Sequence, residues 1–140
     1  MTNISSPELP VENISRLLAL IGQPARIQIL CVIGEQEACV CHLEAALGMR
    51  QASISQHLMA LRKAKLVTAH RDGRNVFYRL AQPAVVALLQ QAAVLAGIHP
   101  ETFQVLACRP VDGCPCPQCN PGIDPQLTCQ NLRSGVKSNS

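Results

Sequence analysis

Apolar residues near the start of the chain recur every three or four positions, which places them on one face of a helix. The recurrence predicts a helix over residues 11–21, ended by Gly22, and a second over 24–33, ended by Gly34. Pro24 stands where the second helix begins, and a first helical turn tolerates proline because its amide groups have no partner within the helix. The chain therefore opens with two short, consecutive helices.

A tight turn joins the next two predicted helices. Apolar positions predict one helix over residues 40–47, and Gly48-Met49-Arg50 forms the turn after it. The following helix spans 51–64 and keeps Ile54, Leu58 and Leu61 on an inner face, which leaves its outer face polar. Two helices joined in this way are typical of the DNA-binding helix-turn-helix.

The last part of the pattern predicts a hairpin and one more helix. β-prone runs over 66–70 and 75–80 flank an Asp-Gly pair, the usual signal of a tight hairpin. A helix over 83–97 is apolar around most of its circumference, so we expect a second copy of the chain to cover it. The predicted fold is mainly α with a small β-hairpin, a dimeric winged helix-turn-helix. The leucines expected at the dimer contact are Leu88, Leu89 and Leu95.

Length and composition fit one folded domain. The chain has 140 residues, of which 48% are hydrophobic and only 2% aromatic, so its core must consist of aliphatic side chains. We expect this domain to occupy residues 1–98, and a Cys-rich tail containing Pro, Gly and Ser to occupy 99–140, flexible without metal. No run approaches the roughly 20 apolar residues of a membrane span, and the polar start lacks the form of a signal peptide. We therefore expect a cytoplasmic protein with no membrane partner.

Positive charge is concentrated between residues 50 and 79. The net charge is only +3, yet this stretch carries seven basic residues and a single acid, Asp72. Such a block suits the phosphate backbone of DNA, and the polar side chains of the fourth helix can reach base edges. A merely solvated surface is the alternative, against which the turn, the hairpin and the basic block count together. The residues predicted to contact double-stranded operator DNA are Arg50, Gln51, Ser53, Ser55, Gln56, His57, Arg71 and Arg74.

Two groups of cysteines are predicted to bind a metal ion. Cytoplasmic thiols are kept reduced, so close-spaced cysteines indicate metal ligands or reactive thiols more than a disulfide framework. Cys39 and Cys41 open the third helix, where an irregular first turn lets both side chains converge on one ion. Simple burial is the alternative for either residue.

The second group lies in the tail, where three cysteines fall within six positions on a proline-rich stretch. It either completes the site of Cys39 and Cys41 or forms a separate one. Cys31 has apolar neighbours and is predicted to belong to the core, and Cys129 is isolated. The predicted metal ligands are Cys39, Cys41, Cys108, Cys114, Cys116 and Cys119.

Four segments between residues 19 and 80 together form a known pattern. They are Gln23-Pro24-Ala25-Arg26-Ile27, Glu37-Ala38-Cys39-Val40-Cys41-His42-Leu43, Gln51-Ala52-Ser53-Ile54-Ser55-Gln56-His57-Leu58 and Val76-Phe77-Tyr78-Arg79-Leu80. In their order and spacing they resemble the ArsR/SmtB family of metal-responsive repressors. The resemblance implies a homodimer, joined through its first and last helices, that represses an operon for ion efflux or detoxification until the ion binds. Glu44 stands where some arsenic-responsive relatives have a third cysteine, so further donors are expected from the tail.

The expected inducer is a soft ion, one of Cd(II), Pb(II), As(III) and Sb(III), with Zn(II) in a thiolate-rich site as a further candidate. The family's helical zinc site takes carboxylates and histidines from the last helix, and residues 83–97 contain neither. We therefore predict a repressor, not an enzyme, that leaves its operator when thiolates bind the ion.

Two other interpretations of the cysteines stay open. The same fold could carry a thiol-based sensor of oxidation or persulfide. A weaker alternative takes Cys116-Pro-Gln-Cys119 as the redox pair of a thiol oxidoreductase. Such pairs act at a helix N-terminus that follows a strand, and no such pattern surrounds this one.

Overall fold

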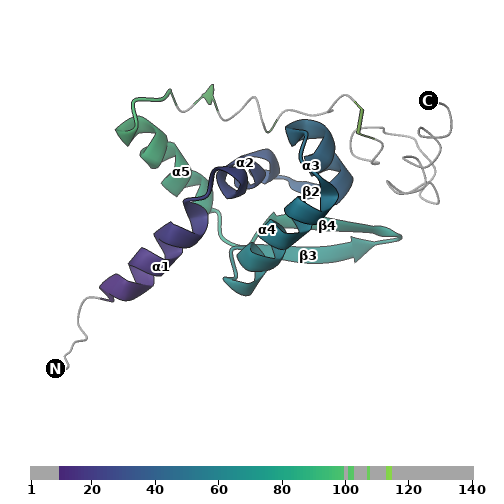
Figure 1. Ribbon diagram of the computed structural model, residues 1–140, viewed down its shortest axis with the longest axis horizontal. Coiled ribbons are helices and arrows are strands. Elements are labelled where there is room, and N and C mark those ends of the chain that lie inside the picture. Colours follow the sequence, from purple (N-terminus) through teal and green to yellow (C-terminus); the bar gives the residue numbers. More distant parts are fainter. Residues whose placement is uncertain (1–9, 100, 103–106, 108–112, 115–140) are drawn as a thin grey trace.

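The computed structural model describes residues 10–99, 101–102, 107 and 113–114. Five helices accompany a three-stranded sheet, and the last helix lies beside the first two, away from the hairpin tip of the sheet (Figure 1). The elements in chain order are α1 (Val11–Ile21), α2 (Pro24–Ile33), β2 (Glu37–Cys39), α3 (Val40–Leu47), α4 (Gln51–Lys63), β3 (Val67–Asp72), β4 (Asn75–Leu80) and α5 (Ala84–Leu95).

The predicted helices form with nearly the expected bounds. Pro24 is the first residue of α2, preceded by an extended Gln23. Gly48 ends α3 in the left-handed conformation, φ 68°, and its amide donates to the carbonyl of Glu44 at 2.8 Å. Glycine takes that conformation without the steric cost that a Cβ would bring, which explains the tight turn into α4.

The sheet has one strand more than the sequence pattern indicated. β2 pairs with β4 and β4 with β3, all antiparallel, so β4 is central. The hairpin β3–β4 also extends to Asp72, beyond the predicted end at residue 70. β2 was missed because three residues are too few to show an alternating pattern.

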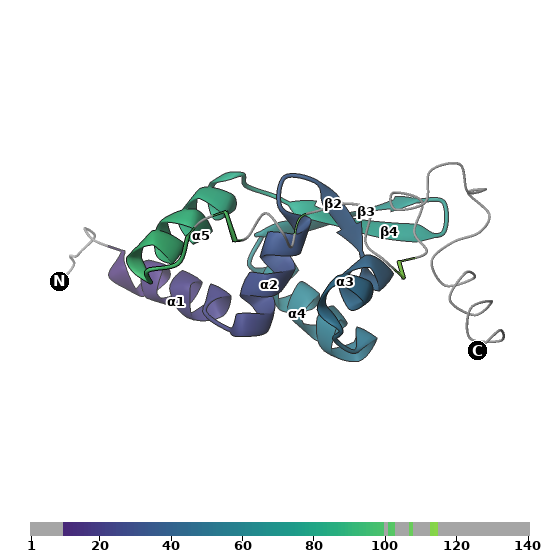
Figure 2. The ribbon, with the colours of Figure 1, turned by 90° about the horizontal axis from the view of Figure 1, so that it is seen from above.

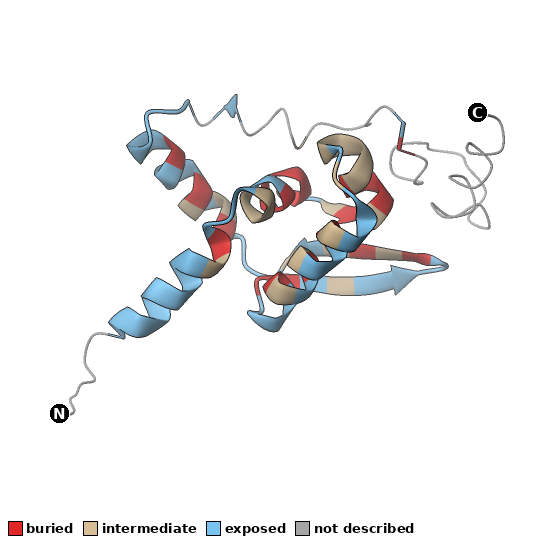
Figure 3. Cartoon of the chain, in the orientation of Figure 1, coloured by how far each residue is buried: buried red, intermediate tan, exposed pale blue. Residues whose placement is uncertain are grey.

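The two faces of the sheet differ in what covers them. Side chains alternate between faces along a strand, so Ala38, Tyr78 and Leu80 share one face while Cys39 and Phe77 share the other. The first face packs on the main apolar core, which contains most of α2 and the inner residues of α3, α4 and α5 (Figure 3). The second face carries a separate small cluster, described below.

Helix α5 corrects one prediction about the dimer contact. Val85, Leu89 and Ala93 follow one another at four-residue spacing and face the core of the same protomer. Leu89 is only 6% exposed, so the expectation that it contacts a partner is wrong, whereas Leu95 is 90% exposed. Because α5 is apolar around its whole circumference, the sequence pattern could not indicate which of its sides faces the core.

Helices α1 and α5 extend from α2 toward the same end of the molecule, opposite the hairpin tip (Figures 1 and 2). Their outer sides hold nearly all of the large apolar side chains that are exposed within the described residues, namely Val11, Ile14, Leu17, Leu18, Val94 and Leu95, with Ile98 just beyond α5. Within the same residues no single helix is long and apolar enough to cross a membrane; α1 and α2 would suffice together, but they meet at 83°.

This arrangement confirms the predicted mainly α fold with a β-hairpin, a winged helix-turn-helix with α3 and α4 as its two characteristic helices. The predicted tail, 99–140, falls mostly outside the described residues. Two of its described residues lie against the domain: Ala107 approaches Gly34 at the end of α2, and Cys114 is buried beside Cys39 and Cys41.

Candidate functional site

Helix α4 presents a polar outer surface next to a basic stretch of chain. Ile54, Leu58 and Leu61 face the core, and this inner side orients the helix. The predicted DNA contacts that are exposed are Arg50, Gln51, Ser55 and Gln56 at the helix and Arg71 and Arg74 at the hairpin; Ser53 and His57 are half-buried. The six exposed side chains are accessible to a ligand as large as a DNA duplex, whereas Ser53 and His57 are less accessible.

His57 is tied to the preceding helices by a residue that the sequence analysis did not single out. Arg26 donates from Nε to Nδ1 of His57 at 3.1 Å and from Nη1 to the carbonyl of Leu20 at 3.0 Å. Burial, and then the positive charge of Arg26, lower the pKa of His57, which favours the neutral form of its ring. The sequence offered one signal for this role of Arg26, namely that it is the single charged residue in the mostly apolar sequence of α2.

Two predicted metal ligands lie together at the junction of β2 and α3. Cys39 ends β2 and serves as the N-cap of α3 with extended dihedral angles, φ −90° and ψ 171°. Cys41 belongs to the first turn of the helix. Because Cys39 is not helical, the two side chains are not forced apart, and their Sγ atoms lie 3.4 Å from each other.

A third thiol residue completes a small buried cluster on the outer face of the sheet. Cys114, the one described cysteine of the tail, is buried there with Cys39, Cys41 and Phe77. Phe77 lies directly opposite Cys39 in the β2–β4 pair and is 3% exposed. Phe77 thus shields the sulfur atoms from solvent on the side of the sheet.

One residue of the cluster, Cys41, is disulfide-bonded. Sulfur atoms gathered this closely can form a disulfide as readily as they can share an ion. Among the described residues no three His, Cys, Asp or Glu side chains are grouped to hold a metal ion.

The remaining predicted ligands cannot be compared with the structure, because Cys108, Cys116 and Cys119 lie outside the described residues, as does Cys129. Cys31 is confirmed as a core residue: it is 7% exposed, and burial raises the pKa of its thiol to about 11. His42 is fully buried within α3, so it does not face solvent.

Charged residues join the three strands on the same outer face. The Glu37 carboxylate accepts hydrogen bonds from His70 at 2.6 Å and from Arg79 at 2.9 Å. Burial alone would raise the pKa of Glu37, but these two bonds and the positive charges of their donors outweigh it and lower the pKa. The His70 ring in turn stacks on Phe77, with centroids 5.8 Å apart.

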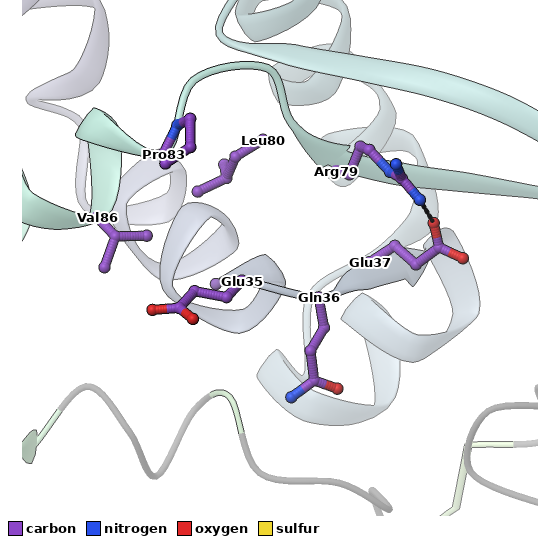
Figure 4. Close-up of a pocket in the computed structure, with 8 residues that line it drawn as sticks. Glu35, Gln36, Glu37, Arg79, Leu80, Pro83 and Val86 are labelled. Atoms are coloured by element: carbon purple, nitrogen blue, oxygen red, sulfur yellow. Dashed lines mark hydrogen bonds and ion pairs between the residues drawn. The ribbon is translucent and has the colours of Figure 1, made fainter.

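A cavity of about 500 Å³ adjoins this charged group, between the end of α2, strand β4 and the start of α5 (Figure 4). Glu35, Gln36, Glu37 and Arg79 line its polar part, and the Glu37 carboxylate accepts a hydrogen bond from Arg79. Leu80, Pro83 and Val86 line its apolar part. None of the cysteines among the described residues lines this cavity.

Comparison with known proteins identifies the family. Residues 23–69 match the model of bacterial regulatory proteins of the arsR family. The transcriptional repressor SmtB of Mycobacterium tuberculosis is 40% identical over 81 residues, which cover 58% of this chain and 60% of that protein. The transcriptional activator HlyU of Vibrio cholerae is 35% identical over 74 residues, which cover 53% of this chain and 68% of HlyU.

Solved structures give the same result. A structure of HlyU from Vibrio cholerae matches 64% of this chain and 97% of its own, at 31% identity and a TM-score of 0.57, and a second is described as reduced HlyU. The repressor BigR of Xylella fastidiosa matches 61% of this chain and 87% of its own, at 28% identity and a TM-score of 0.57. The chain spans only 60–63% of the length of the first curated relatives that it matches. It belongs to the arsR family of bacterial regulatory proteins.

Proposed function

We propose that this protein is a dimeric transcriptional repressor of the ArsR/SmtB type whose affinity for operator DNA is controlled by the thiols of Cys39 and Cys41. The observation that carries the proposal is the 3.4 Å approach of their sulfur atoms at the start of α3, the helix that packs on α4. A chemical change at this junction acts on α4 through direct packing. Coupling of about 1–3 kcal/mol between the two sites would change operator affinity roughly 5- to 150-fold.

The surface of α4 and the hairpin supports DNA as the partner. Gln51, Ser55 and Gln56 are exposed on one helix, and Arg71 and Arg74 are exposed at the hairpin. Polar side chains of a recognition helix contact base edges, and arginines of a wing contact phosphates. SmtB and BigR are described as repressors and HlyU as an activator, so repression follows the majority of these relatives.

The exposed apolar sides of α1 and α5 support a homodimer. Apolar surface on this scale is rare on a monomer, and a two-fold partner would cover both helices at once. Replacing Leu95, which is 90% exposed, by Asp should therefore yield monomers in analytical ultracentrifugation. Met59→Gln, which removes another exposed apolar side chain from a different helix, should leave the dimer intact. A monomeric native protein at micromolar concentration would contradict this assembly.

The sulfur cluster fits a soft metal or metalloid ion. Two thiolates with bonds near 2.3 Å to one ion lie at most about 4.6 Å apart, and the sulfur atoms of Cys39 and Cys41 satisfy this limit. Cys114 is buried beside them, and Cys108, Cys116 and Cys119 are proposed as further donors. Thiolate ligands favour Cd(II), Pb(II), As(III), Sb(III) or Zn(II). Such an ion would link the β2–α3 junction to the tail.

A second candidate function is a thiol-oxidation sensor on the same fold. The observation that favours it is the disulfide of Cys41, formed beside the thiol of Cys39. One solved structure of HlyU, a relative, is described as the reduced form. Both candidates use the same cysteines and differ in the agent that acts on them.

One experiment separates the candidates. The reduced protein is bound to its own promoter under anaerobic conditions and titrated with each ion, and in a second series with peroxide or polysulfide, while DNA binding is followed by fluorescence anisotropy. Release by a thiophilic ion supports the metal sensor, and release by oxidants alone supports the redox sensor. Preferential binding to the promoter over random DNA supports the function as a transcriptional repressor. Equal binding to both would contradict the proposal.

A further inference from the structure

The outer side of α4 carries one large apolar side chain, Met59, among polar and basic residues. The helix turns by about 100° per residue, so its exposed residues fall within a sector of roughly 140° on the side opposite the core. Met59 lies at the centre of this sector and is 64% exposed. The other exposed residues of the sector are Gln51, Ala52, Ser55, Gln56, Arg62 and Lys63.

Met59 also stands apart from the apolar surface of α1 and α5. All other large apolar side chains that are exposed in the described residues belong to those two helices or to Ile98 just after α5. The stretch of chain around Met59 carries only positive charge, since no Asp or Glu occurs between Arg50 and Arg71. A protein surface packed against Met59 would have to tolerate these cations, and DNA meets that requirement through its phosphates.

The major groove offers one apolar group to such a side chain. Thymine presents its 5-methyl group there, and no other base has one. Methionine is long, flexible and polarisable, so it can follow a small apolar group on an otherwise polar groove floor. Gln56 precedes Met59 by three positions and is therefore its neighbour on the helix surface. Glutamine pairs with the N6 and N7 groups of adenine.

We propose that Met59 contacts a thymine methyl group in each operator half-site, beside an adenine bound by Gln56, so that this part of α4 selects A·T pairs. The inference rests on the proposed operator binding and adds the base that the helix reads. Ala52, exposed two turns earlier on the same side, is the second apolar group available for this purpose.

The test removes the methyl group from the DNA. The preferred duplex is selected from a randomised pool with the native, full-length protein, and each thymine of a half-site is then replaced by deoxyuridine, which lacks only that methyl. Deoxyuridine at one position should weaken native binding about fourfold, the effect of exposing one methyl group. Met59→Ala should bind the two duplexes equally at that position, while Met59→Leu should retain the preference for thymine.

Each other outcome has a defined meaning. The inference is overturned if Met59→Ala distinguishes thymine from deoxyuridine as the native protein does, or if it weakens binding to all duplexes equally. It is also overturned if no thymine in the selected half-site matters. Failure to select any sequence would overturn the proposed function instead, and the inference with it. Because Met59 is exposed, an unchanged melting temperature of Met59→Ala should confirm that the variant is folded.

Discussion

The four cysteines that the structure describes are buried in two regions on opposite faces of one sheet. On the core face, Cys31 lies among aliphatic side chains of α2 and its neighbours. On the outer face, Cys39, Cys41 and Cys114 surround Phe77. Exposure is similar in the two regions, at 7% for Cys31 and 3% and 6% for Cys39 and Cys41. The comparison teaches that burial alone does not separate a structural cysteine from a candidate sensor; the neighbouring atoms do.

The neighbours determine what each thiol can do. The apolar surroundings of Cys31 disfavour its thiolate and raise its pKa to about 11, which disfavours its reaction with oxidants and its binding of ions at pH 7. The sulfur atoms of Cys39 and Cys41 are next to one another instead. In the reduced protein, proximity gives them two reactions that Cys31 lacks, disulfide formation and shared coordination of one ion.

The largest expected effect comes from removing the outer pair. Cys39→Ser combined with Cys41→Ser should leave operator affinity unchanged and abolish release by the inducing ion or oxidant, a loss of up to roughly 150-fold in the response. The measurement is anisotropy of labelled operator DNA with and without inducer. Cys31→Val is the matched control, since it replaces an equally buried cysteine. A normal response in the double variant would mean that the sensing cysteines lie in the tail and not at Cys39 and Cys41.

The raised pKa of Cys31 predicts that the free energy of unfolding depends on pH. Above pH 9.0, the ordinary pKa of cysteine, the unfolded chain loses the thiol proton, whereas the folded protein keeps it up to about pH 11. The folded state then binds more protons, so raising the pH favours unfolding. Between pH 9 and 11 the free energy of unfolding should fall by about 2–3 kcal/mol on account of this residue.

Urea unfolding of the reduced protein at several pH values measures this fall. Cys31→Val should flatten the curve in this range, while Cys39→Ser should change it less. Equal slopes for native protein and Cys31→Val would show that the core thiol titrates normally.

The smallest expected effect concerns the charged residues beside the outer cluster. Glu37→Gln weakens the bonds to His70 and Arg79, which are 44% and 58% exposed, so the free energy of unfolding should fall by less than about 1 kcal/mol. Glu12→Gln is the matched control, because Glu12 is 93% exposed and its contact with Arg16 is 4.0 Å long. A much larger loss for Glu37→Gln would mean that the outer face depends on this ion pair more than on Phe77.

The sequence predicted the helices well because their limits have local causes. Pro24 and Gly48 impose backbone conformations through their own chemistry, and the apolar spacing of α4 identifies its inner side. The convergence of Cys39 and Cys41 was also foreseeable, since it depends only on an irregular helix start.

The remaining features depend on distant parts of the chain and could not be derived from local pattern. β2 forms because Glu37 and Cys39 find partners in β4, some 40 residues later. Leu89 turns inward because of α5's packing on α2, which composition cannot reveal. The Arg26–His57 bond and the burial of Cys114 likewise join residues that are far apart in sequence.

The bond from Arg26 has one more consequence, for the tautomer of His57. A guanidinium can only donate, so Nδ1 of His57 must supply a lone pair, and the proton of the neutral ring must reside on Nε2. Nε2 can then serve only as a donor. Any operator group that this ring meets must therefore be an acceptor, such as a phosphate oxygen or the O6 or N7 atom of guanine. Arg26, in the first turn of α2, thus restricts His57 to contacts in which the operator supplies the hydrogen-bond acceptor.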